Sequence, residues 1–312
     1  MKKAIFFLWC GVLLCLSSFQ LKEHHELTPE ELGRLLFEDK RLSADRSISC
    51  ASCHIPAFAF GDTTAVSVGV GGQKGSRNTP AITNMAARTH FFWDGRATSL
   101  EQQVLRPIEN PLEMALPLDE AIARLGADAQ YLSYFQKIYG RQPDTTALAD
   151  ALAAFVRTLE TADTPFDRWM RGDTSAMSEA AIRGHTIFME KGKCFECHFG
   201  PDFTGDEFRN IGLFNGKDLN DPGRFAITRD SADIGRFKVP GLRNVAVSAP
   251  YMHHGAFRTL REVIDYYDNP DRFVPNSIGR DSLLSRPLNL TDREKSDLEA
   301  FLHALTDDRF KR

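Results

Sequence analysis

Two short stretches of the sequence decide the fold: Cys50-Ala51-Ser52-Cys53-His54 and Cys194-Phe195-Glu196-Cys197-His198. Of the six cysteines in the chain, Cys10 and Cys15 lie near the N-terminus, and all the others belong to these two stretches. Cys-x-x-Cys-His is the attachment signature of a c-type heme. The two thiols add to the heme vinyl groups, and the histidine lies beneath the iron as its proximal ligand. The sequence therefore predicts two covalently bound hemes.

Other uses of these cysteines are less consistent with the sequence. Cysteines in an exported protein can form disulfides, and one such motif could be a redox dithiol or half of a zinc site. A histidine directly after each cysteine pair argues against disulfides. Two motifs, and no thioredoxin-like βαβ pattern, argue against the dithiol and zinc interpretations.

Residues 1–20 have the layout of a secretory signal peptide. Two lysines precede an apolar run from Ala4 to Leu16, and small residues follow. The run is short for a transmembrane helix. We therefore expect a periplasmic protein. An uncleaved anchor is the alternative, and Cys15 leaves lipidation open, although the bulky Leu14 precedes it.

Composition and charge set broad limits. The 312 residues are 42% hydrophobic and 26% charged, which is ordinary for a globular protein and enough for two modest cores. The formal net charge of −4 offers no basic excess of the kind that binds nucleic acid. We expect no nucleic-acid partner.

Helix-start signals precede both cysteine motifs. Thr28-Pro29-Glu30-Glu31 predicts an N-cap, a proline in the first turn and a capping-box glutamate, and Ser178-Glu179 predicts a similar start. A third helix is expected from about Thr145 to Thr161, and the last from Thr291 to near Leu305. Segments 69–75 and 106–117 are expected to be ordered loops.

These signals predict a mainly α fold with few short strands. We expect two tandem cytochrome c-like domains, each with one covalent c-type heme. After the signal peptide (1–20), an N-terminal heme domain would span residues 21–162, and a C-terminal heme domain would span residues 163–312. The junction falls where Asp163 and Pro165 follow the third helix.

Beyond the two motifs, the sequence resembles the bacterial diheme cytochrome c peroxidase and MauG superfamily over nearly all of the mature chain. The segments that carry the resemblance are SISCASCH (47–54), GVGGQKGSRNTPAITN (69–84), FFWDGRATSLEQQ (91–103), RPIENPLEM (106–114), KCFECH (193–198) and FKVPGLRNVAVSAPYMHHGAFRTL (237–260). They occur in the family's order, so the resemblance is specific.

The resemblance implies a peroxidatic heme on His54 and an electron-transfer heme on His198. In the cytochrome c peroxidases of this superfamily, a histidine in the loop after the first heme caps the resting iron. The matching residue here is Val70, which cannot bind iron, and Gln73 and Lys74 are poor substitutes. The first heme is therefore expected to be five-coordinate and open to peroxide.

At the second heme these peroxidases use a methionine as distal ligand. The matching residue here is Tyr267, and the MauG-type enzymes also have a tyrosine at this position. A phenolate ligand favours ferric iron, whereas methionine raises the reduction potential. Tyr266 is the alternative in register, and a buried aromatic residue without a ligand role is the ordinary alternative.

The resemblance also assigns roles in the distal pocket. Glu113 matches the acid–base carboxyl group, and Gln103 matches its polar partner. Trp93 matches the tryptophan that relays electrons between the hemes. Taken singly, Glu113 would be a surface carboxylate and Trp93 a core residue.

A calcium ion between the domains is the last implied cofactor, with Asn78, Ser248 and Pro250 at the matching positions. The remaining histidines are not assigned to iron, although His253 or His254 could approach the second heme.

The sequence thus predicts a peroxidase that reduces hydrogen peroxide to water with electrons from a small cytochrome c or cupredoxin. A MauG-type enzyme that oxidises protein tryptophans and a non-enzymatic diheme electron carrier are the alternatives. Family members are often homodimers, but no dimer surface is identified in the sequence.

Overall fold

The chain is mainly helical in a computed structural model that describes residues 27–311. Its α-helices are α1 (Pro29–Glu38), α2 (Cys50–Cys53), α3 (Leu100–Glu109), α4 (Leu118–Gly126), α5 (Ala129–Tyr139), α6 (Thr145–Arg157), α7 (Pro165–Met170), α8 (Glu179–Met189), α9 (Phe225–Thr228), α10 (Leu260–Asp268) and α11 (Asp292–Ala304). Strands β1 (Phe208–Arg209) and β2 (Phe237–Lys238) pair antiparallel. The prediction of a mainly α fold with few short strands is confirmed.

The helix-start signals form the expected caps. The Thr28 hydroxyl accepts a hydrogen bond from the Glu31 N–H, and the Glu31 carboxylate accepts one from the Thr28 N–H, which makes a capping box at the start of α1. Thr291 and Glu294 form the same box at α11. Ser178 caps α8 with its side chain. Local sequence therefore sets where these three helices begin.

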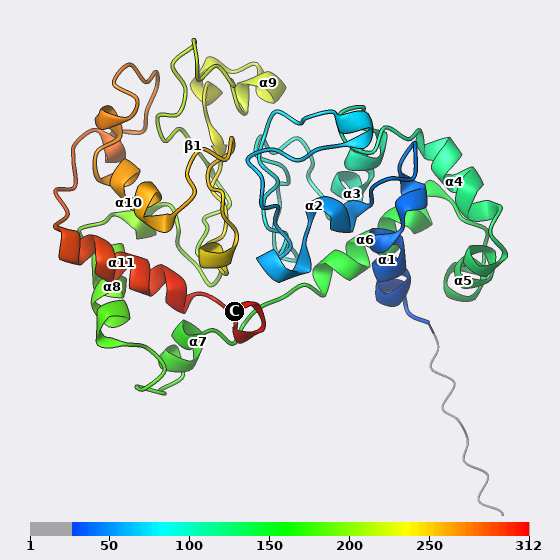
Figure 1. Cartoon of the computed structure of the whole chain (residues 1–312), viewed down its shortest axis with the longest axis horizontal. Helices are drawn as coiled ribbons and strands as arrows, with labels where there is room; N and C mark the ends of the chain where they lie inside the picture. Colours follow the sequence, from blue (N-terminus) through cyan, green and yellow to red (C-terminus); the bar gives the residue numbers. More distant parts are fainter. Residues whose placement is uncertain (1–26, 312) are drawn as a thin grey trace, which may run out of the picture.

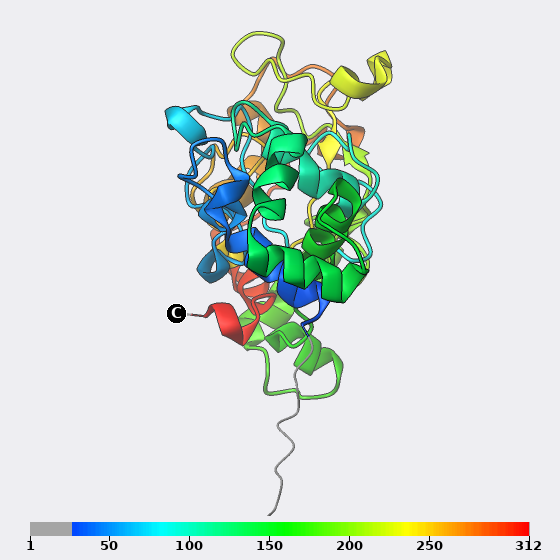
Figure 2. The same ribbon diagram turned by 90° about the vertical axis from the view of Figure 1, so that its right-hand side faces the viewer.

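Two lobes are visible in Figure 1, with α1 to α6 in one and α7 to α11 in the other. We call residues 27–162 the N-terminal half and residues 163–311 the C-terminal half. One apolar core has buried residues from Leu32 to Val156, and a second has them from Met177 to Leu305. Figure 2 shows the N-terminal half from its outer side, where its helices face the viewer.

Each half contains a pair of tightly crossed helices beside its cysteine motif. Helix α1 packs on α6, and α8 packs on α11. Both crossings rely on a glycine: a Cβ atom on Gly33 would overlap the Ala151 carbonyl, and one on Gly184 would overlap the Asp297 carbonyl. Because neither glycine has a side chain, the two backbones can approach closely.

Polar contacts join the two halves. The Asp202 carboxylate accepts hydrogen bonds from Asn84 Nδ2 at 3.2 Å, from Arg243 Nε at 3.1 Å and from Arg88. Arg77 of the N-terminal half forms a two-pronged ion pair with Asp221, with distances of 2.6 and 2.8 Å. The C-terminus lies between the lobes in Figure 1, where Arg309 donates to the Glu160 carbonyl at 2.6 Å.

One expected loop is partly helical. Arg106–Glu109 form the last turn of α3, and Pro107 lies inside the helix. Pro107 has no N–H, so the helical hydrogen bond that would reach the Gln103 carbonyl is absent. Turns follow from Pro111 to Met114. In the segment 69–75, Val70–Gly72 form a single 3₁₀ turn.

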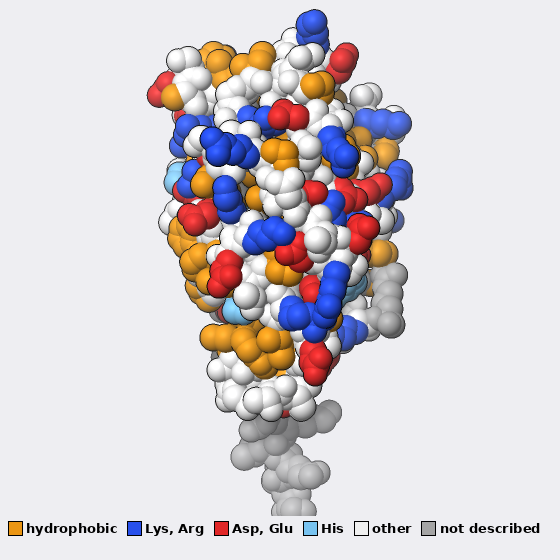
Figure 3. All heavy atoms as spheres, turned by 90° about the vertical axis from the view of Figure 1, so that its left-hand side faces the viewer, with side chains coloured by type: hydrophobic (Ala, Val, Ile, Leu, Met, Phe, Trp, Pro, Cys, Tyr) orange, Lys and Arg blue, Asp and Glu red, His pale blue; other side chains and the backbone are white. Residues whose placement is uncertain are grey.

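The outer surface of the C-terminal half is charged. Figure 3 shows the outer face of the C-terminal half, where basic and acidic side chains are interspersed. Among residues 27–311, no helix is long and apolar enough to cross a membrane. The predicted signal peptide lies outside the described residues.

The close packing of α8 on α11 at Gly184 predicts that a larger residue there destabilises the protein. Gly184→Ala should lower the free energy of unfolding by about 1–3 kcal/mol, because the added methyl group forces α8 and α11 apart. Gly126→Ala at the end of α4 is the matched control, since nothing lies within 4 Å of its added Cβ. Denaturant titration of the heme-loaded protein by circular dichroism measures both, and equal stability of Gly184→Ala and wild type would contradict the prediction.

Candidate heme sites and distal pocket

One large cavity, of about 680 Å³, lies between the two halves and has both Cys-x-x-Cys-His motifs in its wall. Every residue to which the sequence assigns a ligand, catalytic, relay or calcium role also lines it: Cys50, Cys53, His54, Asn78, Trp93, Gln103, Glu113, Cys194, Cys197, His198, Ser248, Pro250 and Tyr267. The structure thus brings these residues together, although their individual roles stay predictions.

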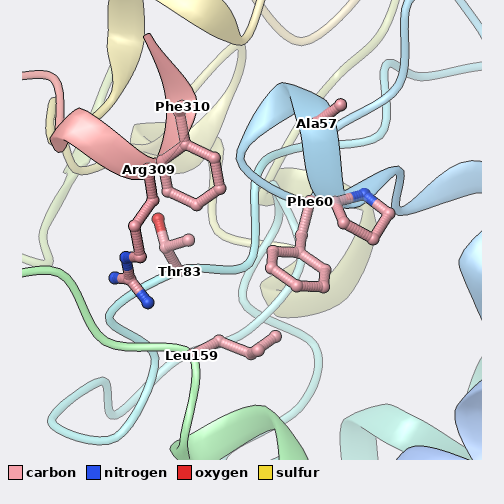
Figure 4. Close-up of a pocket in the computed structure, with 7 residues that line it drawn as sticks. Ala57, Phe60, Thr83, Leu159, Arg309 and Phe310 are labelled. Atoms are coloured by element: carbon pink, nitrogen blue, oxygen red, sulfur yellow. The ribbon is translucent and has the colours of Figure 1, made fainter.

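A second cavity, of about 350 Å³, contains none of them. Figure 4 shows Phe60 and Phe310 facing one another across it, with Arg309, Thr83 and Leu159 beside them. No cysteine or histidine lines this cavity, so it has no group for covalent attachment or ligation of heme.

The two motif histidines are held in the same way. His54 Nδ1 lies 2.8 Å from the Phe60 carbonyl oxygen, and His198 Nδ1 lies 2.9 Å from that of Phe203. A carbonyl only accepts hydrogen bonds, so Nδ1 carries the proton and Nε2 keeps a lone pair. Burial lowers the pKa of both imidazoles, which keeps them neutral. A neutral, oriented imidazole is the form that binds iron.

The backbone around these histidines is shaped for the contact. Phe60 and Phe203 both have a positive φ, of 59° and 55°, although neither is a glycine. This left-handed conformation is uncommon for a bulky side chain. Each loop therefore turns back so that its carbonyl meets the imidazole.

The cysteines are suited to attachment and not to thiol exchange. All four described cysteines are free thiols. Cys50 and Cys53 lie on α2, Cys194 begins the 3₁₀ turn Cys194–Glu196, and Cys197 follows that turn. Burial raises the pKa of Cys50 and of Cys194 to about 12. A dithiol oxidoreductase needs a lowered thiol pKa, so this finding argues against that interpretation.

The cavity wall also fits a group that carries carboxylates, as heme does on its propionates. Arg88 lies in the wall with its side chain only 9% exposed, and its Nε is buried without a hydrogen-bond partner among the described residues. Such a donor is costly unless a ligand satisfies it. No cluster of three or more His, Cys, Asp or Glu that could hold a metal ion occurs in residues 27–311.

Glu113 lies near the cysteines of the first motif, and Gln103 also lines the cavity. Burial raises the pKa of Glu113, and the effects of Asn110 and Arg96 partly oppose this. Asn110 Nδ2 donates to Glu113 Oε1 at 2.7 Å. A raised pKa favours the protonated form of this half-buried carboxyl group, as suits a residue that accepts and returns a proton.

Val70 is buried but does not belong to the cavity wall. Its N–H donates to the Glu113 carbonyl at 2.9 Å. A Cβ on the neighbouring Gly69 would overlap the carbonyls of Leu112 and Glu113, so the loop packs directly on the segment that carries Glu113.

The structure distinguishes the two tyrosines of α10. Tyr266 is fully buried, and its hydroxyl donates to the Ile211 carbonyl at 2.7 Å. Tyr267 lines the cavity, and its ring is close enough to Cys194 and Cys197 that these thiols add to the effect of burial in raising its pKa. Tyr267 is therefore the tyrosine on the side of the second motif.

Trp93 belongs to a group of rings in the wall. Its Nε1 donates to the Asn78 carbonyl at 2.8 Å, and its ring is edge-on to His253 at 6.5 Å between centroids. His253 stacks on Phe237 at 3.7 Å. His254 does not line the cavity, so of the two histidines only His253 approaches the sites.

Asn78 also bears on the expected calcium site. Its Nδ2 donates to the carbonyls of Thr64 and Ala65, both at 3.2 Å, which fixes the direction of its amide oxygen. Asn78, Ser248 and Pro250 share the cavity wall, and calcium binding stays a prediction.

Sequence reasoning missed several residues of these sites. The carbonyls of Phe60 and Phe203 carry no side-chain signal. Asn110 had a partial one, because an asparagine side chain at a turn often accepts from the backbone N–H two residues on, as it does here from Leu112. Arg88 is one of many arginines, and only the structure shows that its Nε is buried without a partner beside the cavity.

The His253 stack predicts an acid-sensitive contribution to stability. Burial and the neighbouring His254 lower the pKa of His253 from about 6.5 to about 3. The unfolded chain therefore binds a proton between these values that the folded chain does not, and stability falls as the pH decreases through this window. His253→Phe should lose less thermal stability between neutral and acidic pH than the wild type. His303→Gln, at an exposed histidine of α11, is the control and should behave as the wild type.

Comparisons with known proteins agree with this arrangement. A family model described as di-haem cytochrome c peroxidase matches residues 28–175. The methylamine utilization protein MauG of Methylorubrum extorquens is 41% identical over 283 residues, covering 89% of this chain and 79% of that protein. The cytochrome c peroxidase Ccp of Escherichia coli is 38% identical over 280 residues, covering 88% of this chain and 57% of that longer protein.

A solved structure shows the same fold. The crystal structure of a MauG-like protein associated with microbial copper homeostasis is 34% identical, with a TM-score of 0.81, and the match covers 91% of this chain and 92% of that one. The resemblance seen in the sequence is confirmed. The chain belongs to the di-haem cytochrome c peroxidase family of oxidoreductases, a membership that implies two c-type hemes.

Proposed function

We propose that the protein is a periplasmic diheme peroxidase that reduces hydrogen peroxide to water. The observation that carries the proposal is the single cavity lined by both Cys-x-x-Cys-His motifs, by Glu113 and by Trp93. The overall reaction is H₂O₂ + 2 H⁺ + 2 e⁻ → 2 H₂O. The reaction needs a group that transfers protons and a route for electrons. The cavity wall contains Glu113 for the first and Trp93 for the second.

Two hemes would be held by residues of this chain, one in each half. Cys50, Cys53 and His54 would attach the first within residues 21–162, and Cys194, Cys197 and His198 the second within residues 163–312. When bound, the hemes supply the iron that binds peroxide and the redox capacity for two electrons. Tyr267 would be the distal ligand of the second heme.

Glu113 would act as the acid–base catalyst. Its carboxylate would accept a proton from hydrogen peroxide and return it to the departing oxygen, and Gln103 would hold the substrate by hydrogen bonding. The raised pKa of Glu113 suits both steps. Val70 cannot bind iron, so the first heme would need no reductive activation before it reacts with peroxide.

Electrons would enter at the second heme from a small cytochrome c or cupredoxin and cross near Trp93. The position of Trp93 in the wall shared by both motifs supports this route. Calcium at Asn78, Ser248 and Pro250 would hold the junction between the halves.

A MauG-type oxidation of tryptophans in a partner protein is the second candidate. Tyr267, on the cavity side of α10, favours it, as does the 41% identity to a methylamine utilization protein MauG. The two activities differ in whether electrons come from a small donor protein or from a protein substrate.

Electron paramagnetic resonance of the oxidised, heme-loaded protein tests the proposal. We expect a high-spin ferric signal beside a low-spin one, with the high-spin signal lost on addition of stoichiometric peroxide. Two low-spin signals unaffected by peroxide would contradict an open first site and would favour an electron carrier or a reductively activated enzyme.

Tyr267 and Tyr266 predict opposite outcomes in this measurement. Tyr267→Phe should change the low-spin signal, because it removes the phenol on the cavity side. Tyr266→Phe should leave the signal unchanged and cost about 1 kcal/mol of stability, because it loses a buried hydrogen bond to the Ile211 carbonyl. A low-spin signal that is the same in Tyr267→Phe and wild type would rule out the ligand role.

The proton role of Glu113 predicts a large kinetic effect. Glu113→Gln should lower kcat/KM for peroxide by about 10²- to 10⁴-fold, because the amide cannot accept the proton. Glu109→Gln, which changes an exposed carboxylate on the same segment, should retain wild-type activity. Steady-state assays with a reduced cytochrome c compare the two, and near-normal activity of Glu113→Gln would exclude the acid–base role.

A further inference from the structure

Asn110 lies between α3 and Glu113, and its side-chain amide makes two hydrogen bonds. Its Oδ1 accepts from the Leu112 N–H at 3.0 Å, and its Nδ2 donates to Glu113 Oε1 at 2.7 Å. Because only the carbonyl oxygen of an amide can accept from a backbone N–H, the Leu112 contact fixes which end of the amide faces Glu113. The end that faces Glu113 is the NH₂ group.

The backbone of Asn110 holds the same segment. Asn110 caps the C-terminus of α3, with its N–H donating to the Arg106 carbonyl. Its own carbonyl accepts from the N–H groups of Glu113 at 2.9 Å and Ala115 at 3.0 Å. The main chain and the side chain of one residue therefore both bind Glu113.

These contacts make the two oxygens of Glu113 inequivalent. Oε1 already accepts the Asn110 N–H, which disfavours a proton on that oxygen. Oε2 forms no hydrogen bond with any other residue of the described chain. Asn110 and Glu113 both line the large cavity.

We propose that Asn110 is a positioning residue that clamps Oε1 of Glu113, so that Oε2 alone accepts and returns the proton. The inference rests on the proposed peroxidase function. It adds Asn110 as a positioning residue and names Oε2 of Glu113 as the atom that carries the proton. Without the clamp, the carboxyl group rotates and presents either oxygen, and the geometry for proton transfer is lost.

Two substitutions separate positioning from a structural role. Asn110→Asp keeps an oxygen to accept the Leu112 N–H, so the turn is preserved, but it places a second carboxyl group against Oε1. Asn110→Ala removes both side-chain contacts. Glu109→Gln is the control for a change of charge at the neighbouring exposed position.

The pH profile of kcat/KM for peroxide is the first measurement. In Asn110→Asp the two carboxyl groups share a proton, so the acidic limb of the profile should move to higher pH by one unit or more. Asn110→Ala should lower kcat/KM by about 10- to 100-fold. Glu109→Gln should keep the wild-type profile.

A second measurement does not depend on turnover. In the infrared difference spectrum on acidification, the carbonyl band of protonated Glu113 is identified by its absence in Glu113→Gln. This band should shift in Asn110→Ala, because the hydrogen bond to Oε1 is gone. Thermal melting confirms that each variant is folded.

The outcomes are distinguishable. If Glu113→Gln is inactive but both Asn110 variants keep the wild-type pH profile and infrared band, Asn110 does not position Glu113 and the peroxidase function stands. If Glu113→Gln is fully active, the proton role of Glu113 is wrong and the role of Asn110 falls with it.

Discussion

The Asp202 carboxylate joins the two halves of the chain that together form the wall of the large cavity. It lies four residues after His198, accepts hydrogen bonds from Asn84 and Arg88 of the N-terminal half, and binds Arg243 of its own half. The cavity exists only while the two halves keep this placement. A buried ion pair adds little net stability, but removal of one partner is costly, so the joint sets geometry more than it adds strength.

The two motifs share a proximal design and differ on their distal sides. Both imidazoles donate Nδ1–H to the carbonyl of a phenylalanine with positive φ, and both motifs lie beside a helix crossing that needs a glycine. Within the shared cavity, Glu113 lies near the cysteines of the first motif and Tyr267 near those of the second. Under the proposed function, these unlike groups would assign peroxide chemistry to one heme and electron transfer to the other.

The sequence predicts what depends on local pattern. The starts of α1, α8 and α11 follow from side-chain caps within three residues, and the heme ligands follow from one fixed motif. Contacts between distant segments have no such signal. The choice between Tyr266 and Tyr267 needed the Ile211 carbonyl, which is 55 residues away from Tyr266. The last turn of α3 was mistaken for a loop because Pro107 is a helix breaker in general.

The hydrogen bond from Trp93 to the Asn78 carbonyl has a consequence for how charge moves. A peptide carbonyl accepts an N–H but is too weak a base to take its proton. An electron that crossed at this indole would therefore move without the indole N–H proton. Under the proposed function, the protons would come by way of Glu113, so electron transfer and proton transfer would use different residues.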